Sequence, residues 1–174
     1  MEPKVTGTAI KGLIIGLIII AISVTNYFIT GNPDNPVKYL VYAVFFGGII
    51  FSIYQYGKEI NYNSTFGNYF SHGFKISALI TLMMIAFIVI FMLSFPEFKE
   101  KILELMKKGI ESQKDITSDQ AEKGMEMYKK GFWLIMIGGA LISYLFMGAI
   151  ASLIGAAITK KQPRLMEDID QIGK

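Results

Sequence analysis

The sequence predicts an all-α, polytopic membrane protein with four transmembrane helices and an extramembrane helical hairpin between spans three and four. Hydrophobic residues make up 52% of the 174-residue chain, and four apolar stretches stand out within it. Each is long enough to cross a hydrocarbon core about 30 Å thick, which takes about 20 residues of helix. A charge-rich segment of about 30 residues separates the last two stretches. We therefore expect a single four-span membrane domain over residues 1–174.

The first two predicted spans are joined by a short turn. The predicted spans are residues 12–30, 37–56, 73–95 and 131–159. Between the first two lies NPDNP (residues 32–36), whose prolines and Asn/Asp residues stop a helix and turn the chain. Spans one and two are therefore expected to form a tight antiparallel hairpin.

A cleaved signal peptide is the alternative for the first span. Lys4 and Lys11 precede its apolar run, and Ala21 with Ser23 loosely resembles a cleavage site for signal peptidase. The apolar run nevertheless continues to Ile29, which favours a retained membrane span.

Residues 65–73 are predicted to form a short aromatic helix in the headgroup layer, ahead of span three. Ser64 is the expected N-cap, and Phe66, Phe70 and Phe74 recur at helical spacing after it. Such a helix would lie along the interface and lead into the third span.

Three further side chains are expected at the membrane interface: His72, Lys75 and Trp133. Lysine at a span end extends its amine to the interface, and tryptophan favours the headgroup level. For His72 and Lys75, contact with a phosphate or a lipid headgroup is the alternative, and an enzyme acting on headgroups is the third hypothesis.

Composition excludes several kinds of chemistry. With no cysteine there is no disulfide, thiolate metal ligand or cysteine nucleophile, and a single histidine gives little basis for a metal site. Lysine alternates with Asp and Glu at a net charge of only +3, so nothing supports a nucleic-acid partner. We expect no catalytic residues, no metal and no cofactor.

Residues 97–130 are predicted to form an amphipathic helical hairpin. Thr117 and Gln120 are spaced as a capping box for the second helix. Four acid-before-base pairs at i, i+4 spacing support helix in both arms, namely Glu97–Lys101, Glu104–Lys108, Asp119–Lys123 and Glu126–Lys130. The hairpin is interpreted as a connector, a docking surface for a partner, or a lid over a substrate path.

Small residues predict close helix packing in spans one and four. The candidates are Gly12 and Gly16 in span one, and Gly139, Ser143, Gly148, Ser152 and Ala156 in span four. Small residues let helix backbones approach closely where no hydrophobic force acts between helices. Packing inside the bundle, homo-oligomerisation and a partner helix are the three uses considered.

Lysine and arginine positions bear on orientation. The numbers of Lys and Arg residues on the two sides of the membrane are nearly equal. The last span, however, ends directly in TKKQPR, at the start of the predicted cytoplasmic tail 160–174. The first predicted span also has lysine only on its amino side. By the positive-inside rule, both termini are expected in the cytoplasm.

Three stretches carry a resemblance to a known family: STFGNYFSHGFKIS, FPEFKEKILE with DITSDQAEKGMEMYKK, and GAIASLIGAAITKK. With the order of the spans, they make the chain similar to the bacterial membrane family called domain of unknown function 4199, which is abundant in Bacteroidota. The resemblance implies a cytoplasmic (inner) membrane location, four spans and a helical loop before the last. It also implies a partner, a lipid-linked sugar transferase.

The predicted function is that of a non-enzymatic accessory subunit that packs with itself or with a partner membrane protein. It depends on the absence of Asp, Glu, Lys, Arg and His from the central parts of the four spans. The alternative is a carrier or channel for a lipid or small neutral solute, with Gly47, Gly48, Gly138 and Gly139 lining its path.

Overall fold

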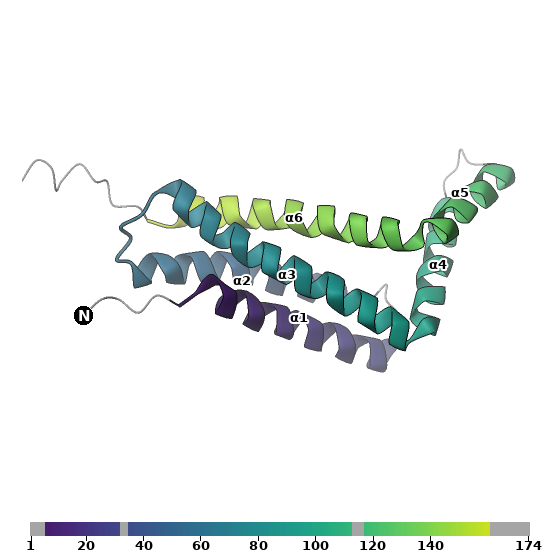
Figure 1. Ribbon diagram of the computed structural model, residues 1–174, viewed down its shortest axis with the longest axis horizontal. Coiled ribbons are helices and arrows are strands. Elements are labelled where there is room, and N and C mark those ends of the chain that lie inside the picture. Colours follow the sequence, from purple (N-terminus) through teal and green to yellow (C-terminus); the bar gives the residue numbers. More distant parts are fainter. Residues whose placement is uncertain (1–5, 32–34, 113–116, 161–174) are drawn as a thin grey trace, which may run out of the picture.

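The computed structural model describes residues 6–31, 35–112 and 117–160, which form helices joined by short connections (Figure 1). The helices are α1 (Thr8–Thr30), α2 (Val37–Glu59), α3 (Phe66–Ser94), α4 (Pro96–Glu111), α5 (Ser118–Lys130) and α6 (Phe132–Ile158). These described parts of the chain contain no strand. Residues 32–34 of the predicted first turn, the connection at 113–116 and the tail beyond residue 160 lie outside the described residues.

Four of the helices, α1, α2, α3 and α6, are long and apolar enough to cross a membrane. This agrees with the four predicted spans and indicates a multi-pass membrane protein. Two helices extend beyond the predicted spans, because α1 begins at Thr8 rather than residue 12 and α2 continues to Glu59 rather than residue 56. These added turns bring charged residues into the helices.

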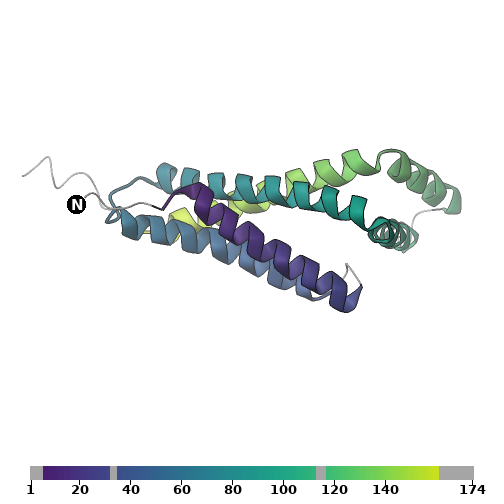
Figure 2. The same cartoon turned by 60° about the horizontal axis from the view of Figure 1, so that its bottom comes forward.

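The four long helices form a bundle in which α3 is central. Helix α3 packs against α6 and α1, α2 packs against α6 and α1, and α2 also touches α3. The beginnings of α1 and α3 and the ends of α2 and α6 lie together at one end, here called the amino end (Figures 1 and 2). The opposite end, from which α4 and α5 extend, is called the α4 end.

The core of the bundle lies toward the amino end. Ile53, Tyr69, Ile76 and Ala156 are fully buried there, together with Phe45 nearer the centre of α2. At the α4 end the first turns of α6 lie away from the end of α3, as both views show (Figures 1 and 2). The two helices approach each other only toward the amino end.

Helix α3 is continuous from Phe66 to Ser94, whereas the sequence predicts an interfacial helix over 65–73 and a separate span over 73–95. Its N-cap is Thr65 rather than Ser64, and the Thr65 hydroxyl accepts a hydrogen bond from the Asn68 N–H at 3.4 Å. Gly73, where the two predicted elements meet, does not break the helix. It is accommodated there by close packing against α2 and α6.

Helices α4 and α5 contact each other, and each also contacts the long helix that it adjoins. Pro96 occupies the first turn of α4, where a proline costs no backbone hydrogen bond. The capping box predicted for α5 is confirmed: the Gln120 N–H donates to the Thr117 hydroxyl at 3.4 Å, and the Thr117 N–H donates to Gln120 Oε1 at 3.0 Å.

Two of the four predicted i, i+4 pairs form ion pairs in the described residues. Glu104 and Lys108 are 2.7 Å apart, and Glu126 and Lys130 are 3.7 Å apart. The Lys108 ammonium lowers the pKa of the Glu104 carboxyl by hydrogen bonding and by charge. Glu97 and Lys101 instead contact the end of α1.

Candidate functional site

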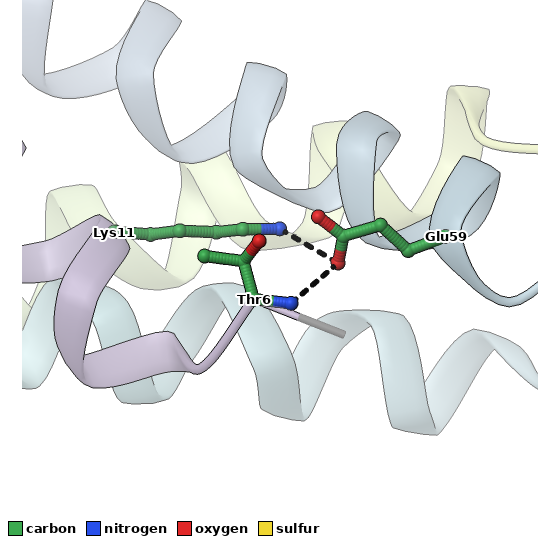
Figure 3. A network of polar contacts seen from close by, with 3 residues as sticks. All are labelled: Thr6, Lys11 and Glu59. Carbon is green, nitrogen blue, oxygen red and sulfur yellow. Dashed lines mark hydrogen bonds and ion pairs between the residues drawn. The ribbon is translucent and has the colours of Figure 1, made fainter. Parts of the chain in front are cut away.

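A buried ion pair joins α1 to α2 at the amino end (Figure 3). Lys11 Nζ lies 3.3 Å from Glu59 Oε2, and the two side chains are only 5% and 14% exposed. The Thr6 backbone N–H donates to the same carboxylate oxygen at 3.1 Å (Figure 3). The carboxylate of Glu59 thus ties together the start of α1 and the end of α2.

Charges are costly to hold inside a membrane bundle, so a buried pair there is a candidate functional feature. Removing one partner of such a pair leaves the other charge buried without compensation. The predicted spans stop short of this pair, because the first begins at residue 12, one position after Lys11, and the second ends at residue 56, three positions before Glu59. Extending both helical patterns by one turn would have brought in both residues.

His72, for which the sequence predicts an interfacial position, lies inside the packing of α2 and α3. Its side chain is 8% exposed, and its ring stacks on Tyr56 with centroids 4.0 Å apart and planes 9° apart. The fully buried Tyr69 packs edge-on against the same Tyr56 ring. The physical reason is the early start of α3, which puts His72 one position before the close contact of Gly73 with α2 and α6.

His72 Nε2 and the Tyr69 hydroxyl are buried without a hydrogen-bond partner among the described residues. His72 interacts electrostatically with the charges of Lys11, Glu59 and Lys75. The amino end of the bundle therefore concentrates polar and ionisable side chains from three helices. We call Lys11, Glu59, Tyr56, Tyr69 and His72 the polar cluster.

The two remaining interfacial candidates lie at opposite ends of the bundle. Lys75 is exposed on α3, one turn beyond His72. Trp133 is half-buried at the start of α6, where Lys99 Nζ of α4 approaches its ring to 5.7 Å and the Phe132 ring to 4.8 Å.

The small residues of α1 face α3. A Cβ added at Gly12 would lie 2.9 Å from Leu79 Cδ2, and one at Gly16 would lie 2.7 Å from Met83 Cε. Both distances are shorter than a normal carbon–carbon contact, so these glycines set how closely α1 approaches α3.

The small residues of α6 divide into two groups. Gly148 is packed so closely that a Cβ there would overlap the Ser77 side chain of α3, and Ser152 and Ala156 are fully buried on the same side of α6. In contrast, a Cβ at Gly139 would meet no atom within 4 Å, and Ser143 is exposed. The second group lies in the half of α6 that diverges from α3.

Two of the four glycines of the predicted solute path border a crevice. Gly47 and Gly48 line a crevice of about 590 Å³ between α1 and α2, which Lys11, Ser52 and Gln55 also border. The residues lining that crevice do not include Gly138 or Gly139.

Helix α4 is tied to the end of α1 by polar contacts. Lys101 Nζ donates to the Gly31 carbonyl oxygen at 2.6 Å, and the Tyr27 hydroxyl donates to Glu97 Oε1 at 3.2 Å. The Tyr27 ring also packs edge-on against Phe98 of α4. Gly31, whose φ of 60° suits a glycine, ends α1 and directs its carbonyl to this contact.

No cluster of three or more His, Asp or Glu residues that could bind a metal occurs in the described ranges. Lys11 and Glu59 instead form an ion pair, and His72 stacks on Tyr56.

A family model described as protein of unknown function (DUF4199) matches residues 11–161. The match includes both members of the buried ion pair and runs through α6. No curated protein and no solved structure matches the chain. The chain belongs to the DUF4199 family of proteins of unknown function.

Proposed function

We propose that this protein is a non-enzymatic accessory subunit of the bacterial cytoplasmic membrane that holds a partner membrane protein through α4 and α5. Both termini are cytoplasmic in this proposal, and α4 and α5 form an extramembrane hairpin on the opposite face. The partner is an integral membrane protein such as a lipid-linked sugar transferase, as the family resemblance implies.

The observation that carries this proposal is the attachment of α4. Lys101 and Glu97 bond to α1, so α4 is held to the bundle by more than its junction with α3. A plain connector between two spans needs no such attachment. A docking element does, because a rigid surface loses less conformational entropy on binding than a mobile one.

The surface of this element supports a docking role. A groove of about 840 Å³ runs between α4 and α5. Apolar side chains such as Leu103 and Met125 line it together with Lys107, Glu126 and Lys129. A protein interface has an apolar core within a polar rim, and we assign the charged side chains of this groove to the rim.

Crosslinking in native membranes, followed by purification in mild detergent and mass spectrometry, tests the partner. We expect one membrane protein to be recovered reproducibly, and the double variant Lys107→Glu/Lys129→Glu to lose it. Lys123→Glu is the matched control, because Lys123 is exposed on α5 and does not line the groove. Recovery of the chain alone, or equal loss in the control, contradicts docking through this groove.

The orientation is tested by labelling, which is simple because the chain has no cysteine. In intact cells, a membrane-impermeant maleimide is expected to label Ser112→Cys and not Lys160→Cys. Labelling of the second variant alone would reverse the proposed orientation. Substrate turnover by the purified protein in liposomes would contradict the non-enzymatic role.

A further inference from the structure

A half-open cavity of about 210 Å³ lies among the helices at the α4 end. Its walls come from α1, α2, α3, α4 and α6 and include Val41, Met84, Phe87, Phe91, Phe98 and Tyr144. A protein cavity of about 150 Å³ with apolar walls is large enough to bind benzene. This cavity therefore has room for a small apolar group between spanning helices.

A second space lies against α1 and α2. It is a crevice of about 390 Å³ formed by the last turns of α1 and the first turn of α2, and Ala21, Ile22, Ile29 and Leu40 line it. Asn26 and Val37 border both the crevice and the cavity. The two spaces are therefore separated only by the contact between α1 and α2 at these residues.

Two of the wall hydroxyls are already bonded within the protein. The Ser23 hydroxyl donates to the Ile19 carbonyl oxygen at 2.9 Å, and the Thr30 hydroxyl donates to the Asn26 carbonyl oxygen at 2.8 Å, so their hydrogens are in use. Lys38, Tyr42 and Tyr144 also line the cavity, but its surface is mainly apolar. An apolar chain requires no hydrogen bonds and suits the aromatic lining.

We propose that this cavity binds the acyl chain of a membrane phospholipid, which passes from the bilayer between α1 and α2. Both helices are candidate spans, so lipid chains are the molecules that surround the crevice. Ala21 and Thr25 are small, which leaves the crevice open along α1. The cavity is a lipid-binding site, independent of the docking function proposed for α4 and α5.

Helix α4 closes one side of this site. Phe98 contributes to the cavity wall, and the contacts of Lys101 and Glu97 with α1 hold α4 in position. A chain in the cavity would therefore touch the helix that carries the proposed docking surface.

Tryptophan quenching by phospholipids with brominated acyl chains tests the proposal, because bromine quenches a tryptophan only on contact. Trp133 is the single tryptophan and is removed first as Trp133→Phe. Phe87→Trp in that background reports on the cavity, Phe45→Trp on the fully buried core and Ile90→Trp on the exposed surface of α3. The protein is reconstituted into vesicles of brominated phosphatidylcholine.

We expect strong quenching in the Phe87→Trp variant, and loss of that quenching when Thr25→Phe fills the crevice. Gly47→Phe is the matched control, since it fills the other α1–α2 crevice and should leave the quenching unchanged. Quenching of Phe87→Trp no stronger than that of Phe45→Trp overturns the proposal, as does quenching that Thr25→Phe leaves intact. If Phe87→Trp fails to fold, Val41→Trp samples the same cavity and is judged by the same outcomes.

Discussion

Neutralising Glu59 should destabilise the bundle more than neutralising Lys11. Glu59→Gln leaves the Lys11 ammonium only 5% exposed and without its counter-charge. Lys11→Met leaves a carboxylate that is 14% exposed and still accepts the Thr6 N–H. The lysine is therefore the more poorly compensated of the two charges when its partner is removed.

The size of the effect follows from the geometry. Two unit charges 3.3 Å apart attract by about 5 kcal/mol at an effective dielectric constant of about 20. Desolvation of both groups offsets much of this, so the pair adds little net stability relative to two neutral residues. Loss of one partner from a buried pair costs about 3 to 5 kcal/mol. We expect about 3 kcal/mol for Glu59→Gln, at the lower end of that range, and about 2 kcal/mol for Lys11→Met, below it because Glu59 is more exposed and keeps its bond from the Thr6 N–H.

Equilibrium unfolding of the purified protein in detergent micelles measures these free energies. The double variant Lys11→Met/Glu59→Gln should be no less stable than Glu59→Gln alone, because it leaves neither charge buried. The coupling energy between the two sites is then at least about 2 kcal/mol. Additive losses, agreeing to within about 0.5 kcal/mol, would refute the argument that the two charges stabilise each other.

Three further predictions concern packing, α4 and pH. Gly148→Val should lower the free energy of unfolding by about 2 kcal/mol through overpacking, whereas Gly139→Val should leave it unchanged, and unfolding in micelles compares them. Lys101→Met should speed hydrogen exchange in α4 while the thermal midpoint stays nearly constant, because one hydrogen bond contributes about 1 kcal/mol. Glu104 has a lowered pKa, so its contribution to α4 stability is present above the usual carboxyl range and is lost as the pH falls through the lowered value. NMR titration should find that Lys108→Ala returns this pKa toward its usual range.

The positions of the spanning helices could be predicted because the bilayer sets a length requirement that composition alone reveals. The capping box of α5 was also predictable, since Thr117 and Gln120 act on backbone groups three residues away. The continuity of α3 was not predictable, because the sequence of its first two turns is typical of an interfacial helix when taken alone. What keeps the helix continuous is tertiary, namely the space that Gly73 leaves for Ile53 and Ser152.

The candidate site was less predictable than the fold. Helical spacing identifies Gly148, Ser152 and Ala156 as one side of α6, but it equally identifies Gly139 and Ser143. Which group is packed depends on where α6 diverges from α3, and that geometry is a property of the whole bundle (Figure 1). The pairing of Lys11 with Glu59 likewise depends on how α1 and α2 align, because the two residues lie 48 positions apart in the sequence.

The two ends of the bundle differ in how closely their helices pack. At the amino end, close glycine contacts and the polar cluster join α1, α2 and α3 tightly, and changes there should affect stability first. At the α4 end α6 diverges from α3, leaving a cavity and a loosely packed stretch of α6, while Tyr27 of α1 still packs against Phe91 of α3. The two proposed interactions, with a lipid chain and with a partner protein, both lie at the α4 end, away from the close contacts of the core.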